Sequence, residues 1–357
     1  MNIHFWPILT ALILLSFSSQ AQAKPDTDEP QSDELETVSP PPVPTPANER
    51  FVGIAYGLWH KSPDWGDSAW GTPSLGTYAS DDRAIIRQHA TILADAGVDF
   101  VWLDWSNNIN YVYDPANKRP DFDMIEDATF TVFDEFARMR AQGLKTPDIS
   151  IFAGITLAPE AATDGRLQRK ADQIWNQFVA NPVYRPLLQQ YEGKPLLVVY
   201  INTPSPVLDG VPDWDDPRFR VRWMTGYITE QPTLRTPDLI SKYGYWSWED
   251  RGPQTFPIHN GHAEAMVINA ATRPQSEPGD HDYIPASPRE NGATFRRSWA
   301  RAHELGPKFG MIVSWNEWNK GEQPSAEISK DVEPSKEFGD LYLKIMKEEI
   351  AHFKTGE

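Results

Sequence analysis

A glutamate bracketed by two tryptophans lies near the end of the chain, in the segment SWNEWNKGEQ (314–323). Glu317 is the central acid and directly follows a strongly apolar run, so part of its surroundings would be dry. Burial raises the pKa of a carboxyl group and makes it usable as a proton donor or acceptor near neutral pH. Glu317 is therefore the strongest catalytic candidate. An ion pair with an arginine is the structural alternative.

Other acids and aromatic residues follow other apolar runs at a comparable position. The catalytic candidates beside Glu317 are Asp104, Glu249 and Glu322; the candidates for substrate binding are Trp59, His60, Trp105, Asn107, Trp246, Trp248, Trp315, Asn316, Trp318 and Lys320. Flat aromatic faces can stack on sugar rings, while carboxylates and amides bind the hydroxyl groups. The combination predicts a carbohydrate site. Taken singly, each tryptophan also fits ordinary packing at a rim, and Asp104 also fits a turn cap.

The sequence predicts neither a metal site nor a cofactor. Its 357 residues include no cysteine, which excludes thiolate ligands and cysteine nucleophiles. The pattern H-x-x-H-x-E at His259, His262 and Glu264 matches no closed zinc spacing and contains the turn signal HNG. A serine triad has no G-x-S-x-G segment to support it.

Eight apolar, β-rich runs precede the candidate residues. They span 51–59, 98–105, 148–155, 195–201, 219–227, 244–248, 263–270 and 308–318. Several are continuously apolar, which is typical of parallel strands that are buried on both faces. Helical patterns fall at 81–97, with Ser80 as its expected N-cap, and at 124–143, 167–180, 294–306 and 335–353.

This alternation predicts a single (β/α)₈ TIM barrel over residues 51–357, with the candidate residues gathered at the carboxyl ends of its strands. The rival architecture is a doubly wound open sheet. No Gly-rich dinucleotide or P-loop signature supports that rival.

The first fifty residues predict export. Residues 1–23 resemble a signal peptide, with an apolar run at 5–17 and a small-x-small cleavage pattern at Ala21 to Ala23, although the first residues carry no Lys or Arg. Residues 24–50 are acidic and Pro-rich and predict a disordered linker. We expect a secreted or periplasmic protein without stable membrane insertion after cleavage; an uncleaved anchor is the alternative. The net charge of −17 argues against nucleic acid as a partner, and the oligomeric state is not indicated.

Three segments resemble a known family. SWNEW (314–318), GKPLLVVY (193–200) and AGVDFVWLDW (96–105) are similar to glycoside hydrolase family 99, the endo-α-mannosidase-like (β/α)₈ enzymes, and to related bacterial polysaccharide-processing proteins with a WNEW strand. The resemblance implies two glutamates three residues apart, the first assisting the substrate's O2 and the second acting as acid/base. The first falls on Glu317, but the second falls on Lys320, so this chain departs from the family pattern there.

The residues predict a metal-independent glycoside hydrolase that acts on an oligosaccharide or polysaccharide. Such chemistry needs one protonated and one ionised carboxyl group. Lys320 would favour an anionic sugar by charge pairing. Two alternatives remain open: a polysaccharide lyase that uses His60 or a tyrosine as base and Lys320 as charge neutraliser, and a glycan-binding barrel without catalysis.

Overall fold

A parallel barrel forms the body of the protein in the computed structural model, which describes residues 41–110, 123–156, 158–201, 211–226, 228–230, 232–275, 278–281 and 283–356. The predicted signal peptide and the first part of the predicted linker lie outside the described residues. Pro42–Glu357 is one compact unit, and all further description concerns it.

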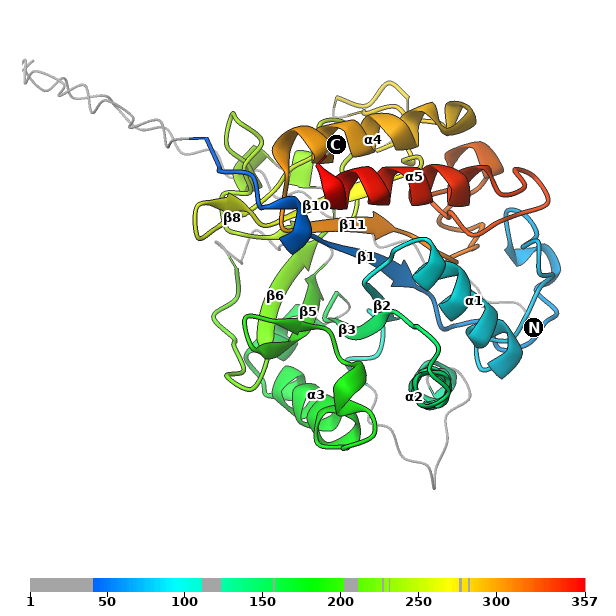
Figure 1. Ribbon diagram of the computed structural model, residues 1–357. Helices are drawn as coiled ribbons and strands as arrows, with labels where there is room; N and C mark the ends of the chain where they lie inside the picture. Colours follow the sequence, from blue (N-terminus) through cyan, green and yellow to red (C-terminus); the bar gives the residue numbers. More distant parts are fainter. Residues whose placement is uncertain are drawn as a thin grey trace, which may run out of the picture. The chain divides into compact units, whose positions relative to one another are not determined.

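Eight strands of the main sheet run parallel in the order β10-β11-β1-β2-β3-β5-β6-β7 (Figure 1). Their bounds are β1 (Phe51–Tyr56), β2 (Phe100–Trp105), β3 (Asp148–Gly154), β5 (Lys194–Ile201), β6 (Arg220–Thr225), β7 (Trp246–Ser247), β10 (Ala265–Asn269) and β11 (Phe309–Val313). β1 is the first strand of the sequence and β11 the last, and the two pair with each other. The sheet therefore curves round into a nearly closed barrel. The prediction of a (β/α)₈ barrel is confirmed.

Three short strands lie beside the barrel. β4 (Gln190–Tyr191) pairs antiparallel with β5, and β8 (Ile258–His259) forms a hairpin with β9 (His262–Ala263). The HNG segment is therefore the turn of a hairpin, as its sequence indicated.

Alternating residues of the strands fill two separate cores. On β2, Phe100 and Trp102 belong to the core inside the barrel, whereas Val101, Leu103 and Trp105 belong to the core between strands and helices. Both faces of a barrel strand are buried, which explains the continuous apolar runs. Asp104 has the same alternation as Phe100 and Trp102, so it continues the inward row towards the barrel mouth.

Five α-helices cover the strands in the described residues: α1 (Arg83–Asp95), α2 (Asp123–Ala141), α3 (Arg166–Ile174), α4 (Ala293–Leu305) and α5 (Leu341–Thr355). The expected Ser80 cap is wrong, because Asp82 caps α1 by accepting from the amides of Ala84 and Ile85. The final helix begins at Leu341 rather than near 335, because Ser335 and Gly339 hydrogen-bond each other in a turn. Between β6 and β10, the helices of the described residues are short 3₁₀ turns, and no α-helix occurs there.

The last nine residues before β1, 42–50, contact the amino-terminal end of the barrel. The Val43 amide donates to the carbonyl of Gly261, and the Thr45 amide donates to that of Gly306. This part of the acidic, Pro-rich segment therefore lies against the barrel. Within the described ranges, every helix is too short or too polar to cross a membrane.

Candidate active site

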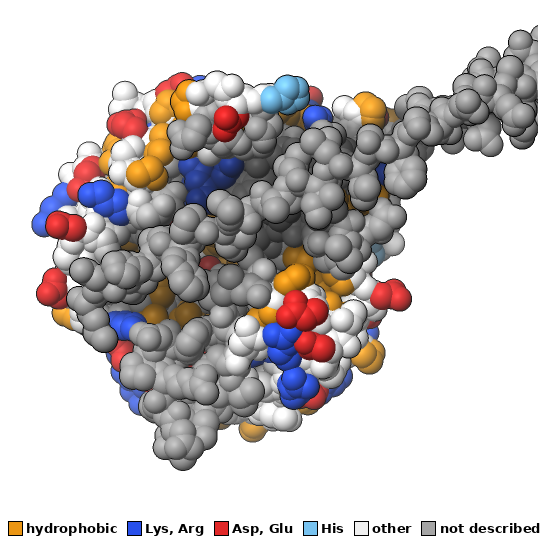
Figure 2. All heavy atoms as spheres, turned by 180° about the vertical axis from the view of Figure 1, so that it is seen from behind, with side chains coloured by type: hydrophobic (Ala, Val, Ile, Leu, Met, Phe, Trp, Pro, Cys, Tyr) orange, Lys and Arg blue, Asp and Glu red, His pale blue; other side chains and the backbone are white. Residues whose placement is uncertain are grey.

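A cavity of about 440 Å³ opens where the carboxyl ends of the barrel strands meet. Its lining combines three acids with two cations, amides and aromatic rings: Trp59, Asp104, Ser106, Asn107, Asn108, Met124, Ile125, Phe152, Thr156, Tyr200, Trp248, Arg273, Glu317, Asn319, Glu322 and Lys330. Seen from the side opposite to Figure 1, the surface is hollowed, and basic side chains lie within the hollow (Figure 2). Pockets of this size at this end of a barrel are where ligands bind in such folds.

Glu317 lies in the loop that follows β11, and a buried carboxylate fixes its backbone. Asp331 accepts from the amide of Glu317 at 2.7 Å and from that of Trp318 at 2.8 Å. The Ser314 hydroxyl and the Trp70 indole also donate to Asp331, at 2.5 and 2.7 Å. Asp331 therefore holds the WNEW segment after the strand has ended at Val313.

The Glu317 carboxyl group is nearly buried, with 9% of the residue exposed. Gln323 donates to its Oε2 at 2.8 Å, and Lys330 Nζ lies 3.5 Å from the same atom. Burial raises the pKa of Glu317 to about 7, against the opposing effect of Lys330 and with smaller contributions from nearby acids, Asp104 among them. The carboxyl group is thus able to hold or release a proton near neutral pH, as the sequence predicted.

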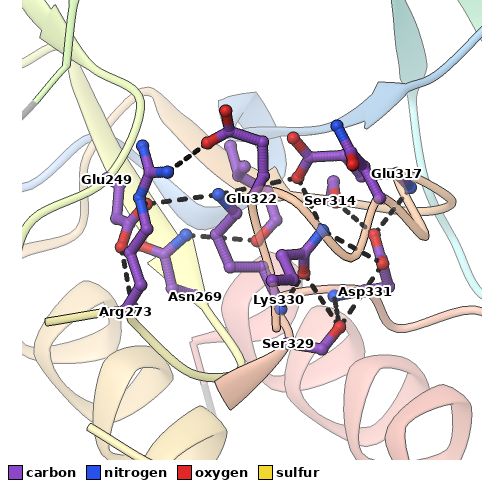
Figure 3. A network of polar contacts seen from close by, with 12 residues as sticks. Glu249, Asn269, Arg273, Ser314, Glu317, Glu322, Ser329, Lys330 and Asp331 are labelled. Atoms are coloured by element: carbon purple, nitrogen blue, oxygen red, sulfur yellow. Dashed lines mark hydrogen bonds and ion pairs between the residues drawn. The ribbon is translucent and has the colours of Figure 1, made fainter. Parts of the chain in front are cut away.

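A chain of alternating charges runs along one side of the cavity (Figure 3). Lys330 Nζ lies between Glu317 and Glu249, 3.2 Å from Glu249 Oε2. Arg273 contacts Glu249 through its backbone amide at 3.1 Å and forms an ion pair with Glu322. Burial opposes the charge on Lys330, but Glu249 and Glu317 outweigh it and raise its pKa to about 12. Glu249 is fully buried; it belongs to this row of alternating charges but does not line the cavity.

Asp104 lines the cavity at the carboxyl end of β2. Only 6% of the residue is exposed, and the Ser106 amide donates to its Oδ1 at 2.7 Å. Burial raises the pKa of Asp104. Of the three acids predicted as partners of Glu317, Asp104 and Glu322 line the cavity, and Glu322 is already paired with Arg273.

Two of the predicted tryptophans, Trp59 and Trp248, line the cavity. Trp248 stacks on Phe152 with ring centroids 5.2 Å apart. The structure places the other strand-end tryptophans elsewhere, because their side chains continue the packed layers: Trp105 and Trp315 lie in the core under the helices, and Trp246 lies inside the barrel.

Asn316 and Trp318, the sequence neighbours of Glu317, do not line the main cavity. Asn316 bridges both backbone groups of Gly57, and the Trp318 indole donates to Glu333 at 2.7 Å. Trp318 and His60 do line an adjoining cavity of about 430 Å³, which shares Trp59, Glu317 and Asn319 with the first. Burial lowers the pKa of His60, whose ring stacks on Trp65.

Asn107 is exposed at the cavity lining, whereas the exposed Lys320 lies outside it. The lysine that contacts Glu317 is instead Lys330, ten residues after Lys320. Sequence analysis missed Lys330 together with Arg273, Gln323 and Asp331. Gln323, Lys330 and Asp331 lie in the polar stretch after the last apolar strand, which was their only signal, whereas Arg273 follows β10.

Candidate metal ligands lie outside the cavity. Among the described residues, His303, Glu349 and His352 are the one group with ligand atoms close enough for an ion. The H-x-x-H-x-E residues do not form such a group: His259 bonds to Glu192, while Glu264 accepts from Tyr191, Arg222 and Trp246.

Comparisons with known proteins agree with the resemblance seen in the sequence motifs. No family model matches the chain, and no curated protein matches it. Two solved structures of the family 99 endo-α-mannosidase from Bacteroides thetaiotaomicron, one in complex with bis-tris propane, are similar to it, with TM-scores of 0.54 and, for the complex, 0.53. The alignments cover 85% of this chain and 98% of the mannosidase at 15% and 14% identity. Glycoside hydrolase family 99 endo-α-mannosidases are thus among the structural neighbours of this chain, which shares the barrel fold with them.

Proposed function

We propose that this chain is a glycoside hydrolase that cleaves glycosidic bonds in an oligosaccharide or polysaccharide at the cavity around Glu317. The observation that carries the proposal is the Glu317 carboxyl group, nearly buried, facing the cavity and with a pKa raised to about 7. A second carboxyl group, Asp104, lies in the same lining beside the aromatic rings of Trp59 and Trp248. With the apolar segment at the start of the chain, we place its action outside the cytoplasm.

Glu317 has the role of the proton donor to the leaving oxygen, and Asp104 is the ionised partner that acts as base or nucleophile. Two interacting carboxyl groups in different environments divide into an acid and a base, and the group with the higher pKa serves as the acid. A pKa of about 7 allows Glu317 to hold that proton near neutral pH, while the Ser106 amide that donates to Asp104 favours the ionised form of Asp104 against the effect of its burial. This assignment differs from the one that the family resemblance implies, because Lys320 stands where the family has its acid/base.

The charges favour a neutral glycan as substrate. The expectation of an anionic sugar depended on Lys320, which lies outside the main cavity. The two cations in the described lining already face carboxylates, Lys330 with Glu249 and Glu317, and Arg273 with Glu322. An anionic ring would therefore compete with these acids for the same cations.

The lyase alternative finds less support in the geometry. Burial raises the pKa of Tyr200, the tyrosine of the lining, which opposes its use as a base. His60, the other expected base, already contacts the carbonyl of Asn316 through its ring nitrogen Nε2 at 3.2 Å, which opposes the use of this nitrogen as a base. Lys320, the expected charge neutraliser, lies outside the main cavity, and the two cations of the described lining already face carboxylates.

The test is a panel of neutral and anionic glycans incubated with the full chain and assayed for new reducing ends. We expect turnover on a neutral glycan, and a loss of at least about 100-fold in Glu317→Gln and in Asp104→Asn, as is usual for a missing acid or base. Glu304→Gln is the matched control, because Glu304 is an exposed acid of α4 that pairs with Arg301. It should retain the activity of the wild type.

Three results would contradict the proposal. Binding of a glycan without turnover would indicate a carbohydrate-binding barrel, and new unsaturated ends that absorb in the ultraviolet would indicate a lyase. Full activity of Glu317→Gln would remove Glu317 from the reaction.

A further inference from the structure

A second group of ligand-type side chains lies outside the cavity, where α4 and α5 run side by side (Figure 1). His303 comes from α4, and Glu349 and His352 come from α5. Their ligand atoms all lie within 4.8 Å of one another, and His303 Nε2 is 2.8 Å from Glu349 Oε2. The rings of His303 and His352 meet edge to face at 5.5 Å.

Helix geometry brings these three side chains to one place. Glu349 and His352 are three residues apart on α5, so they project from the same face of the helix. His303 reaches them from the last turn of α4. Three potential ligands on two packed helices form a more rigid arrangement than ligands on loops.

Neighbouring residues orient the two less exposed members of the group. Arg296 donates to Glu349 Oε1 at 2.9 Å, which leaves Oε2 directed at His303. The His303 ring lies nearly parallel to the Trp299 ring, with centroids 5.8 Å apart. Outer contacts of this kind fix the orientation of ligating side chains in metal sites.

We propose that His303, Glu349 and His352 bind one zinc(II) ion, with water as the fourth ligand. Two imidazoles and a carboxylate are ligands that zinc accepts, whereas calcium and magnesium prefer oxygen alone. Tetrahedral zinc places its ligand atoms about 3.3 Å apart, given metal–ligand distances of about 2.0–2.1 Å. His303 and Glu349 need to separate slightly, and the exposed His352 needs to turn inward.

The site lies at the opposite end of the barrel from Glu317. α4 ends at Leu305, just before β11 begins at Phe309, and the carbonyl of Phe353 accepts from Arg50, which directly precedes β1. The end of α4 and the contact of Phe353 with Arg50 therefore both lie at the amino-terminal end of the strands. Zinc would therefore join α4 to α5 without a part in the proposed hydrolysis.

The test is calorimetric titration of the metal-free full chain with zinc chloride. We expect one ion per chain, and an affinity lower by about tenfold or more in His352→Ala and in Glu349→Gln. His259→Ala is the matched control, because His259 is a surface histidine paired with Glu192 at a different place. Zinc should also raise the Tm of the wild type more than that of His352→Ala. Binding should weaken at acidic pH, since imidazole must be deprotonated to ligate.

Cobalt(II) supplies an independent readout. A tetrahedral site with two imidazoles should give visible absorption bands that disappear in His303→Ala and His352→Ala. Equal zinc affinity in the wild type and in both histidine variants would overturn the proposal. So would the lack of any binding heat at a tenfold excess of zinc.

Discussion

Lys330 contacts two carboxylates, and its charge acts directly on Glu317. We predict that Lys330→Met raises the pKa of Glu317, because the ammonium group 3.5 Å away favours the ionised carboxylate. If Glu317 is the proton donor, activity falls as the pH rises through its pKa. The variant should therefore show this fall at a higher pH than the wild type, measured as kcat/KM against pH.

Lys320→Met is the control for that experiment. Lys320 lies only three residues after Glu317, but its side chain is exposed and outside the cavity. Its replacement should leave the pH profile unchanged. A profile that moves with Lys320 and not with Lys330 would contradict the assignment.

The raised pKa of Glu317 also has a consequence for stability. In the unfolded chain Glu317 ionises near 4.5, whereas in the folded protein it ionises near 7, so the folded state loses stability as the pH rises between these values. Glu317→Gln cannot ionise. We predict that it matches the wild type at pH 4 and has a free energy of unfolding higher by about 3 kcal/mol at pH 8. Urea unfolding at both pH values measures the difference, and equal stability at pH 8 would contradict the prediction.

The residue types in the WNEW segment were sufficient to find Glu317, but not its neighbours. Glu317 follows an apolar strand, so its burial could be expected from the sequence. Lys330 and Asp331 sit in the polar segment ISKDVEPS, which resembles a solvated loop. They are buried because the loop folds back, where Gln323 accepts from the Lys330 amide at 2.6 Å and Asp331 binds the amides of Glu317 and Trp318. Such contacts between non-adjacent segments leave no local pattern.

The loop after β11 is the element that carries the proposed active site. Trp318 in this loop has a φ of 54°, a left-handed conformation that a bulky residue seldom adopts. Asp331 holds this conformation, since its two oxygens accept from the amides of Glu317 and Trp318. The geometry of Glu317 thus depends on one buried carboxylate.

We predict that Asp331→Asn lowers the free energy of unfolding by about 2–3 kcal/mol, because the new amide group would face one of these backbone donors. It should also reduce kcat, since Glu317 loses its fixed position. Asp340→Asn is the control: Asp340 is an exposed acid that pairs with Lys344, so its loss should change stability by less than about 1 kcal/mol. Urea unfolding and turnover measure both effects, and a small change in Asp331→Asn would refute the role of the carboxylate.

All eight predicted strands correspond to strands of the barrel, but their ends do not. The sequence predicted a strand over 308–318, whereas β11 ends at Val313 and the next residues turn away. Strand alternation would have separated Asp104, in the inward row with Trp102, from Trp105, which packs under the helices. For Trp315 no such rule applies, because it follows the end of the strand. No helical pattern is predicted between β6 and β10, and the described chain there contains short 3₁₀ turns and short strands but no α-helix.

At the scale of the whole molecule, Glu264 joins parts of the barrel that its strand ladder leaves apart. Among the described residues, β7 and β10 are the two ends of the ladder and do not pair. Glu264 directly precedes β10 and is buried; its carboxylate accepts from Trp246 of β7 at 2.8 Å and from Arg222 of β6 at 2.7 Å. The hydroxyl of Tyr191 donates to it as well, at 2.8 Å. The acid of the H-x-x-H-x-E pattern thus closes the barrel.

We predict that Glu264→Gln lowers the free energy of unfolding by about 3–5 kcal/mol, because it leaves the mostly buried guanidinium of Arg222 without its carboxylate. Glu192→Gln is the matched control, since Glu192 pairs with His259 and Arg220 at a more exposed place and its loss should cost about 1 kcal/mol or less. Urea unfolding measures both. Hydrogen exchange should show faster opening of β7 and β10 than of β1 and β2 in Glu264→Gln. β1 and β2 hydrogen-bond to each other, whereas β7 and β10 do not. Uniform exchange across all four strands, or equal stability of the two variants, would show that the barrel closes without Glu264.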